Sequence, residues 1–145
     1  MTKVSRSFDV DVPPDVAVPY LADFANAVEW DPGTVTCVRN DSGPVRVGSS
    51  WHNTSKLAGI STELTYTLEE LGDERVVLVG RNKTATSKET IDVVPSGTGA
   101  RVTYENDLAL NGAAKLAAFP AKLLFEKVGN DVEKQLSEAL NALAR

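Results

Sequence analysis

Alternating apolar and polar positions dominate the middle of the sequence. In one segment, Thr62, Leu64, Tyr66 and Leu68 alternate with polar neighbours, which is typical of a strand with one buried face. Turn residues separate such segments at a spacing of about 10–12 residues, the signature of an antiparallel meander. The pattern predicts strands over Thr34–Asn40, Ser49–Leu57, Thr62–Glu69, Arg75–Arg81, Ala85–Val94 and Ala100–Leu110.

The N-terminal part of the chain adds one more strand and a helical segment. Val4, Phe8, Val10 and Val12 share one face of a strand that Pro13-Pro14 ends, because proline donates no hydrogen bond to a ladder. Beyond it, apolar residues recur at steps of three and four. This predicts one helix, or two short helices broken near Asn26, over the range from Asp15 to about Val28.

The C-terminal part changes period after Asn111-Gly112. Leucine and valine residues then recur at three, four or seven positions, which predicts one long helix with a broad apolar stripe over Pro120–Ala144. Such a helix would be roughly 37 Å long at 1.5 Å per residue. It is the only predicted element able to cover the apolar face of the sheet. The stripe is expected to include Leu116, Leu136 and Leu143.

The predicted fold class is α+β of the helix-grip type. It has a seven-stranded curved antiparallel sheet wrapped around the long C-terminal helix, with two short helices after the first strand. No linker, repeat or low-complexity segment divides the sequence. We therefore expect residues 1–145 to form a single domain.

Polar residues interrupt the inward face of the predicted sheet. Asn53, Ser55, Thr62, Glu89 and Asn106 fall in phase with aromatic and aliphatic residues. An unpaired buried amide or hydroxyl costs a few kcal/mol, so a close-packed core seldom contains so many polar groups. A mixture of aromatics with scattered polar groups is what the wall of a ligand cavity would look like.

Composition and charge narrow the possible partners. The net charge is −5, and the basic residues are scattered, which disfavours nucleic acid because binding to it draws on clustered Lys and Arg. The single cysteine, Cys37, excludes an internal disulfide. No apolar signal region or membrane-length stretch is present, so we expect a cytoplasmic protein with no membrane span.

Glu89 is the sharpest candidate for chemistry. If Ile91 and Val93 face inward, unbroken alternation brings Ser87 and Glu89 to the same face. A carboxylate in a partly apolar cavity has a raised pKa and could serve as general acid or base. The alternative is that a bulge turns Glu89 to solvent, or that it lies at an open rim.

Other residues offer less. Tyr66 and Tyr104 could hydrogen-bond a ligand carbonyl or simply be core aromatics. His52, the single histidine, is out of phase with Trp51 and Asn53, and no HxxxH or CxxC spacing exists, so we expect no metal site. No phosphate cradle is present either, and we expect no cofactor.

The sequence resembles the START-like (SRPBCC) superfamily, which includes polyketide cyclase/dehydrase-like proteins. The resemblance lies in the stretch Tyr20–Pro32 (YLADFANAVEWDP), the Val47-Gly48 pair before Trp51 and the strand Gly99–Tyr104. The resemblance covers essentially the whole chain and implies a helix-grip fold with a cavity between helix and sheet. It also implies that the cavity binds a small hydrophobic ligand that is lipid-, polyketide- or isoprenoid-like. Candidate cavity residues are Trp30, Trp51, Asn53, Thr62, Tyr66, Glu89, Tyr104, Asn106, Phe119 and Leu123.

Two other classes of function compete with ligand binding. One is a cyclase or aromatase-like enzyme that uses Glu89 as acid or base, with Tyr66 or Tyr104 as oxyanion donor. No second inward ionisable group is predicted beside Glu89, whereas acid–base chemistry often uses two. The other class is an interaction module, which the polar outer face of the sheet makes improbable.

Overall fold

The computed structural model describes residues 2–57, 59–110 and 118–144; for residues 2, 57, 60 and 118–125 it describes the backbone alone. The elements follow in the order predicted from the sequence. They are β1 (Thr2–Val10), α1 (Pro14–Ala22), a 3-10 turn (Phe24–Asn26), α2 (Ala27–Trp30), β2 (Thr34–Arg39), β3 (Ser50–Leu57), β4 (Ile60–Leu71), β5 (Arg75–Arg81), β6 (Ala85–Ser96), β7 (Gly99–Leu110) and α3 (Ala118–Ala142).

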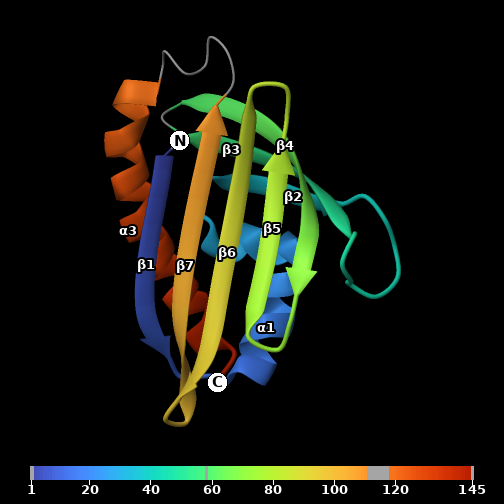
Figure 1. Ribbon diagram of the computed structural model, residues 1–145, viewed down its shortest axis with the longest axis vertical. Coiled ribbons are helices and arrows are strands. Elements are labelled where there is room, and N and C mark those ends of the chain that lie inside the picture. The colour runs from blue at the N-terminus through green and yellow to red at the C-terminus, as the bar shows by residue number, and fades with distance from the viewer. Residues whose placement is uncertain (1, 58, 111–117, 145) are drawn as a thin grey trace.

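The seven strands form one antiparallel sheet. Its order is β1-β7-β6-β5-β4-β3-β2, so every neighbouring pair except β1 and β7 is consecutive in the chain. The sheet is strongly curved, and β2 to β4 run at a steep angle to β1, β7 and β6 (Figure 1). Register shifts between Leu68 and Glu70 and between Thr34 and Thr36 locally disrupt the ladders, and such bulges bend strands. The helices lie on the concave side, as the helix-grip fold requires.

The helical segment after β1 breaks earlier than the sequence predicts. The break lies at Asp23, whose extended backbone ends α1 and whose carboxylate accepts a hydrogen bond from the Ala25 amide. Asp at this position favours a cap because its side chain replaces a missing backbone partner. The three- and four-residue spacing of Leu21, Phe24 and Val28 predicts that all three share the apolar face. For Val28 this is wrong: it is 50% exposed, and Ala27 and Trp30 are the buried residues of α2.

The C-terminal helix α3 packs along β1. A methyl group added at Gly129 would lie 2.6 Å from Val4 Cγ2 and 3.0 Å from Arg6 Nη2, so glycine permits the close approach. Arg6 fastens the contact, with Nη2 3.1 Å from Glu126 Oε2 and 3.0 Å from Asn130 Oδ1.

The apolar stripe of α3 is only partly as predicted. Val132, Leu136 and Leu140 are fully buried against the core. Leu143, which was also expected there, lies beyond the end of α3 and is 38% exposed. The predicted stripe residue Leu116 lies outside the described residues.

Candidate functional site

Glu89 lies on the inner face of the sheet, in the middle of β6. Its partners across the ladders are Leu78 on β5 and Asn106 on β7, and neither ladder is interrupted near it. The residue is only 3% exposed, so the alternative in which a bulge turns it to solvent is wrong. A carboxyl group has therefore been placed inside the core, where it needs partners.

Two tyrosines supply hydroxyl groups to this carboxyl. Tyr66 on β4 donates a hydrogen bond to Glu89 Oε1 at 3.4 Å, a long and weak contact. The Tyr104 hydroxyl on β7 also favours the charged carboxylate and acts to lower the pKa of Glu89. Glu89 Oε2 is buried and has no hydrogen-bond partner among the described residues.

The electrostatic surroundings of Glu89 oppose its negative charge. Removal from water raises the pKa of Glu89 well above its usual range, and the nearby charge of Asp31 raises it further. The hydroxyls of Tyr66 and Tyr104 act in the opposite direction but are weaker. Burial, with the charge of Glu89, also raises the pKa of both tyrosines well above the ordinary value, so they remain hydroxyl donors.

Aromatic rings surround the carboxyl on its helix side. The Phe24 ring lies 4.4 Å from the ring of Tyr66 and 6.0 Å from that of Trp30, and Trp30 in turn meets Tyr104 edge-on at 6.0 Å. These four rings connect Tyr66 with Tyr104, the two tyrosines whose hydroxyl groups favour the charged form of Glu89. Trp51, edge-on to Phe24, extends the group along β3.

The two indole groups are unusual for buried tryptophans. Both Trp30 and Trp51 are 0% exposed, and both Nε1 donors are without a hydrogen-bond partner among the described residues. Buried Trp N–H groups usually find a partner. Together with Glu89 Oε2, they give the interior two unused donors and one unused carboxyl oxygen.

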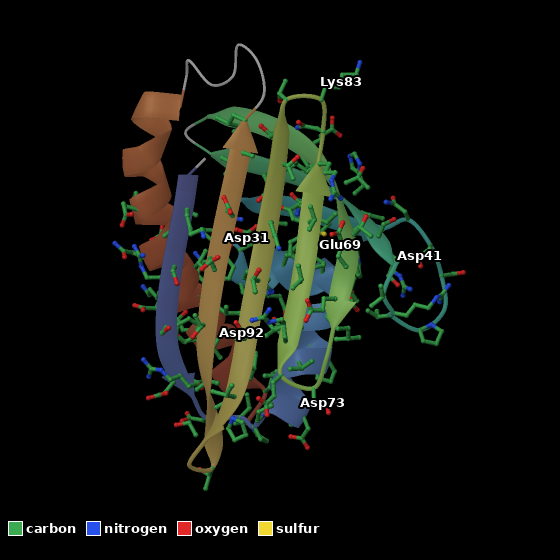
Figure 2. The ribbon with its side chains drawn as sticks, viewed as in Figure 1. Asp31, Asp41, Glu69, Asp73, Lys83 and Asp92 are labelled. Carbon is green, nitrogen blue, oxygen red and sulfur yellow. The ribbon has the colours of Figure 1, made fainter. Side chains whose placement is uncertain are left out.

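A hydrogen-bonded chain of polar residues lies on the β2–β3 side. Asp31 accepts from Thr34 Oγ1 at 2.7 Å, Thr34 Oγ1 accepts from Asn53 at 3.0 Å, and Asn53 Oδ1 accepts from Ser55 at 2.6 Å. Asp31 also accepts from the Gly33 amide, which confirms its role as a turn residue. It lies within the outline of the sheet, whereas Asp41, Asp73 and Lys83 stand on loops (Figure 2).

A second polar pair lies beside Glu89. Asn106 donates to Ser87 Oγ at 2.8 Å, and both residues are buried. With Glu89 they form the polar end of the inner face of β6 and β7. We call Ser87, Glu89, Asn106, Tyr66 and Tyr104 the Glu89 cluster.

The structure brings together most, but not all, of the predicted site residues. Trp30, Trp51, Asn53, Tyr66, Glu89, Tyr104 and Asn106 are all buried, and Thr62 is half-buried opposite Ser55. Phe119 and Leu123 belong to the first turns of α3, but their side chains lie outside the described residues.

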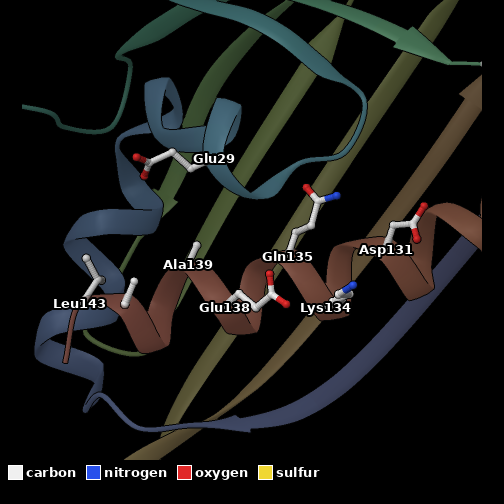
Figure 3. Close-up of a pocket in the computed structure, with 8 residues that line it drawn as sticks. Glu29, Asp131, Lys134, Gln135, Glu138, Ala139 and Leu143 are labelled. Carbon is white, nitrogen blue, oxygen red and sulfur yellow. The ribbon is translucent and has the colours of Figure 1, made fainter. Parts of the chain in front are cut away.

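Two surface hollows lie away from this cluster. The larger, about 720 Å³, is formed by α3 with Glu29 of α2 and includes Gln135 and Ala139 (Figure 3). The other, about 680 Å³, lies between α1 and the turn from β4 to β5. None of the predicted site residues lines either hollow.

The remaining cysteine and histidine offer no further candidate for chemistry. Burial raises the pKa of the Cys37 thiol to about 11, so it stays protonated at neutral pH. His52 faces out, as predicted, and lies 2.7 Å from Glu63 Oε1. Within the described ranges, no group of three His, Cys, Asp or Glu residues could hold a metal ion. None of the described helices is long and apolar enough to cross a bilayer.

Sequence reasoning missed three parts of this site. Arg6 is in phase with Val4 and Phe8, and that phase is the signal that could have placed it beside α3. Asp31 gives no signal in the sequence, because its effect on the pKa of Glu89 depends on how distant segments fold together. Gly80 lies directly opposite Tyr66, where an added methyl group would come within 2.6 Å of the ring; a glycine inside a strand is the signal that could have revealed it.

The comparisons agree with this architecture. The family model described as "Polyketide cyclase / dehydrase and lipid transport" matches residues 1–145. No curated protein sequence matches the chain.

Solved structures share the fold at low identity. A START superfamily protein from Mycobacterium smegmatis is 12% identical with a TM-score of 0.77, and a protein from Thermus thermophilus is 15% identical with a TM-score of 0.80; both alignments cover 99% of each chain. The Zhui aromatase/cyclase from a Streptomyces species is 15% identical with a TM-score of 0.71, over 97% of this chain and 90% of that one.

Proposed function

Because the chain belongs to the polyketide cyclase/dehydrase and lipid transport family, we propose that it binds a small hydrophobic ligand between the sheet and α3. The ligand is lipid-, polyketide- or isoprenoid-like, and it contacts the Glu89 cluster. Trp30, Trp51, Asn53 and Thr62 complete the proposed contact surface, and Phe119 and Leu123 remain predicted members of it.

One observation carries this proposal. Glu89 Oε2 and the two indole Nε1 atoms are buried without partners among the described residues, around one group of aromatic rings. A buried polar group without a partner costs about 1–3 kcal/mol. A ligand that is apolar over most of its surface and carries an oxygen would lower this cost while it buries its own apolar area.

The test is a titration followed by NMR. A fatty acid, a methyl ketone, a flavonoid and an aromatic polyketide are added separately to the labelled protein. Binding should move the two indole N–H signals and the amides of Ser87, Glu89 and Asn106. The outward-facing Lys88 and Glu105 on the same strands are the control amides. If no ligand moves the indole signals at about 1 mM, a concentration that detects even weak complexes, the proposal fails.

A second function, a cyclase-like activity, is favoured by a second carboxyl group, that of Asp31, whose charge raises the pKa of Glu89. The two carboxyl groups interact, and removal from water raises the pKa of both. Two carboxyls in different environments can divide the roles of acid and base. Glu89 would protonate the carbonyl oxygen of a bound polyketone, and Tyr66 or Tyr104 would donate a hydrogen bond to that oxygen.

This activity is tested with a linear triketone. Cyclisation by intramolecular aldol addition, followed by loss of one water, is followed by mass spectrometry. Glu89→Gln should reduce the rate by about 100-fold, the usual lower bound for a lost general acid, while Glu105→Gln leaves it unchanged. Equal rates in the two variants would remove Glu89 from the mechanism.

A further inference from the structure

The charges around the Glu89 cluster bear on the kind of ligand that it accepts. The charge that acts on Glu89 most strongly is that of Asp31, and it is negative. The charge of Asp31 also reaches Tyr66 and Tyr104, and both carboxyl groups act on Cys37. Asp31 therefore contributes negative charge to the surroundings of the cluster, in a low-dielectric interior where like charges repel strongly.

The partly buried cations nearest in the fold are already paired. Arg6 lies opposite Tyr104 on β1, but its guanidinium is held by Glu126 and Asn130 of α3. Arg39 lies opposite Trp51 on β2, but it is held by Asp41, by Ser49 Oγ and by the carbonyl groups of Gly43 and Pro44. Neither contributes a positive charge to the surroundings of Glu89.

A carboxylate ligand would meet these conditions badly. It would lose its water, find the two partly buried arginines, Arg6 and Arg39, already paired, and meet the negative charge of Asp31. Removing an ion from water costs several kcal/mol unless a partner compensates. A ketone or alcohol oxygen has no such cost, because it accepts a hydrogen bond and carries no charge.

The donors present match a neutral oxygen. The indole N–H groups of Trp30 and Trp51 and the hydroxyls of Tyr66 and Tyr104 all donate, and a protonated Glu89 adds one more O–H. Glu89 has no described cation to hold it in the charged form, and its free Oε2 is buried.

We propose that the Glu89 cluster selects uncharged hydrophobic ligands that carry a carbonyl or hydroxyl oxygen, and that it rejects fatty-acid carboxylates. This inference rests on the proposed ligand-binding function and names its substrate class. Glu89 is then a specificity residue, because it donates a hydrogen bond to the ligand oxygen. Together with Asp31 it lowers the affinity of the site for an anionic ligand.

The test compares two ligands of equal carbon number, one uncharged and one a carboxylate. A twelve-carbon methyl ketone and the twelve-carbon fatty acid are titrated into the full chain, below their aggregation limits, and the two indole N–H signals are followed. At about pH 7.5 the ketone should bind at least about ten-fold more tightly, since one uncompensated desolvated charge is worth that much or more. As the pH falls through the pKa of the fatty acid itself, its affinity should approach that of the ketone.

Variants of Glu89 provide the second readout. Wild-type affinity for the ketone should fall as the pH rises, because Glu89 loses the proton that it donates to the ligand. Glu89→Gln should abolish this fall, because its amide donates a hydrogen bond at every pH. Glu105→Gln, on the outer face of β7, is the matched control and should retain the wild-type pH profile. Four other titratable groups interact with Glu89 and can affect the pH profile. They are Asp31, Tyr66, Tyr104 and Cys37.

The outcomes separate the two proposals. If the acid binds as tightly as the ketone at about pH 7.5, where a carboxylic acid is fully ionised, the selectivity is disproved and ligand binding stands. If the ketone binds without moving either indole signal, the Glu89 cluster is not its site and the selectivity is again disproved. If neither ligand nor any other hydrophobic probe binds, the proposed function itself is wrong.

Discussion

The inner face of β6 and β7 has two halves of opposite character. The half near the β6–β7 hairpin carries Ile91, Val93, Ala100 and Val102, all fully buried and all apolar. The other half carries the β6 and β7 members of the Glu89 cluster, which are polar and also buried, at 3–6% exposure: Ser87, Glu89, Tyr104 and Asn106. Both halves belong to the same two strands, share one uninterrupted register and differ in what the inward positions contain.

The difference separates stability from specificity. The apolar half packs against the core without polar groups to satisfy, so its burial stabilises the fold directly. The polar half buries groups that cost free energy when they lack partners. The sheet thus buries polar groups without partners in one half, next to a half that is apolar and well packed. Such a local loss of stability is consistent with a ligand-binding site.

The largest expected effect comes from the apolar half. Ile91→Ala removes a fully buried side chain and should lower the free energy of unfolding by about 3 kcal/mol, because it leaves a cavity in close packing. Urea unfolding measures the change. Thr90→Ala, one residue away on the outer face, is the control and should cost less than about 1 kcal/mol. A loss below about 1 kcal/mol for Ile91→Ala would contradict the assignment of this half as the stabilising one.

The second effect concerns the packing of the Tyr66 ring against Gly80. In Gly80→Ala the new methyl group would come within 2.6 Å of the Tyr66 ring, so the ring must move, and overpacking should cost about 1–3 kcal/mol. The movement should also alter the contact between Tyr66 and Glu89, which NMR of the tyrosine ring can detect. Gly72→Ala is the matched control, since a methyl group there meets nothing within 4 Å. Equal stability of the two variants would show that Tyr66 has room to spare.

The third effect is a pH dependence of stability that Glu89→Gln removes. The pKa of Glu89 is raised in the folded state, so between its ordinary pKa and its folded pKa the folded chain binds more protons than the unfolded one. Stability from this group is therefore fully present below the ordinary value and is lost as the pH rises through the folded value. One proton limits the slope to about 1.4 kcal/mol per pH unit. The free energy of unfolding of wild type minus Glu89→Gln should fall with rising pH, and a flat difference would show that Glu89 is not perturbed.

The sequence predicted the order of elements and the inward faces because alternation is a local property. It found Glu89 through the phase that Ile91 and Val93 set. It did not predict that Asp31 acts on Glu89, since that depends on how the loop after α2 meets β6. Nor did it locate the break at Asp23, where a side-chain cap competes with helix continuation. The indole N–H groups of Trp30 and Trp51 have no partner within the described part of the chain, and this depends on packing that no local pattern encodes.

The smallest expected effect comes from repeating the Glu89 substitution on the outer face. Glu63 lies 2.7 Å from His52, but the two side chains are 66% and 48% exposed. Solvent and salt screen such a pair, so Glu63→Gln should change the free energy of unfolding by less than about 0.5 kcal/mol. Urea unfolding at low and high salt measures it, and any difference should shrink as salt is added. The same chemical change, glutamate to glutamine, should thus have a large effect on the pH dependence of stability at Glu89 and a small effect on stability at Glu63. The cause of the difference is that Glu89 is buried and Glu63 is exposed. If Glu63→Gln changed the pH dependence of stability as much as Glu89→Gln does, that distinction would be removed.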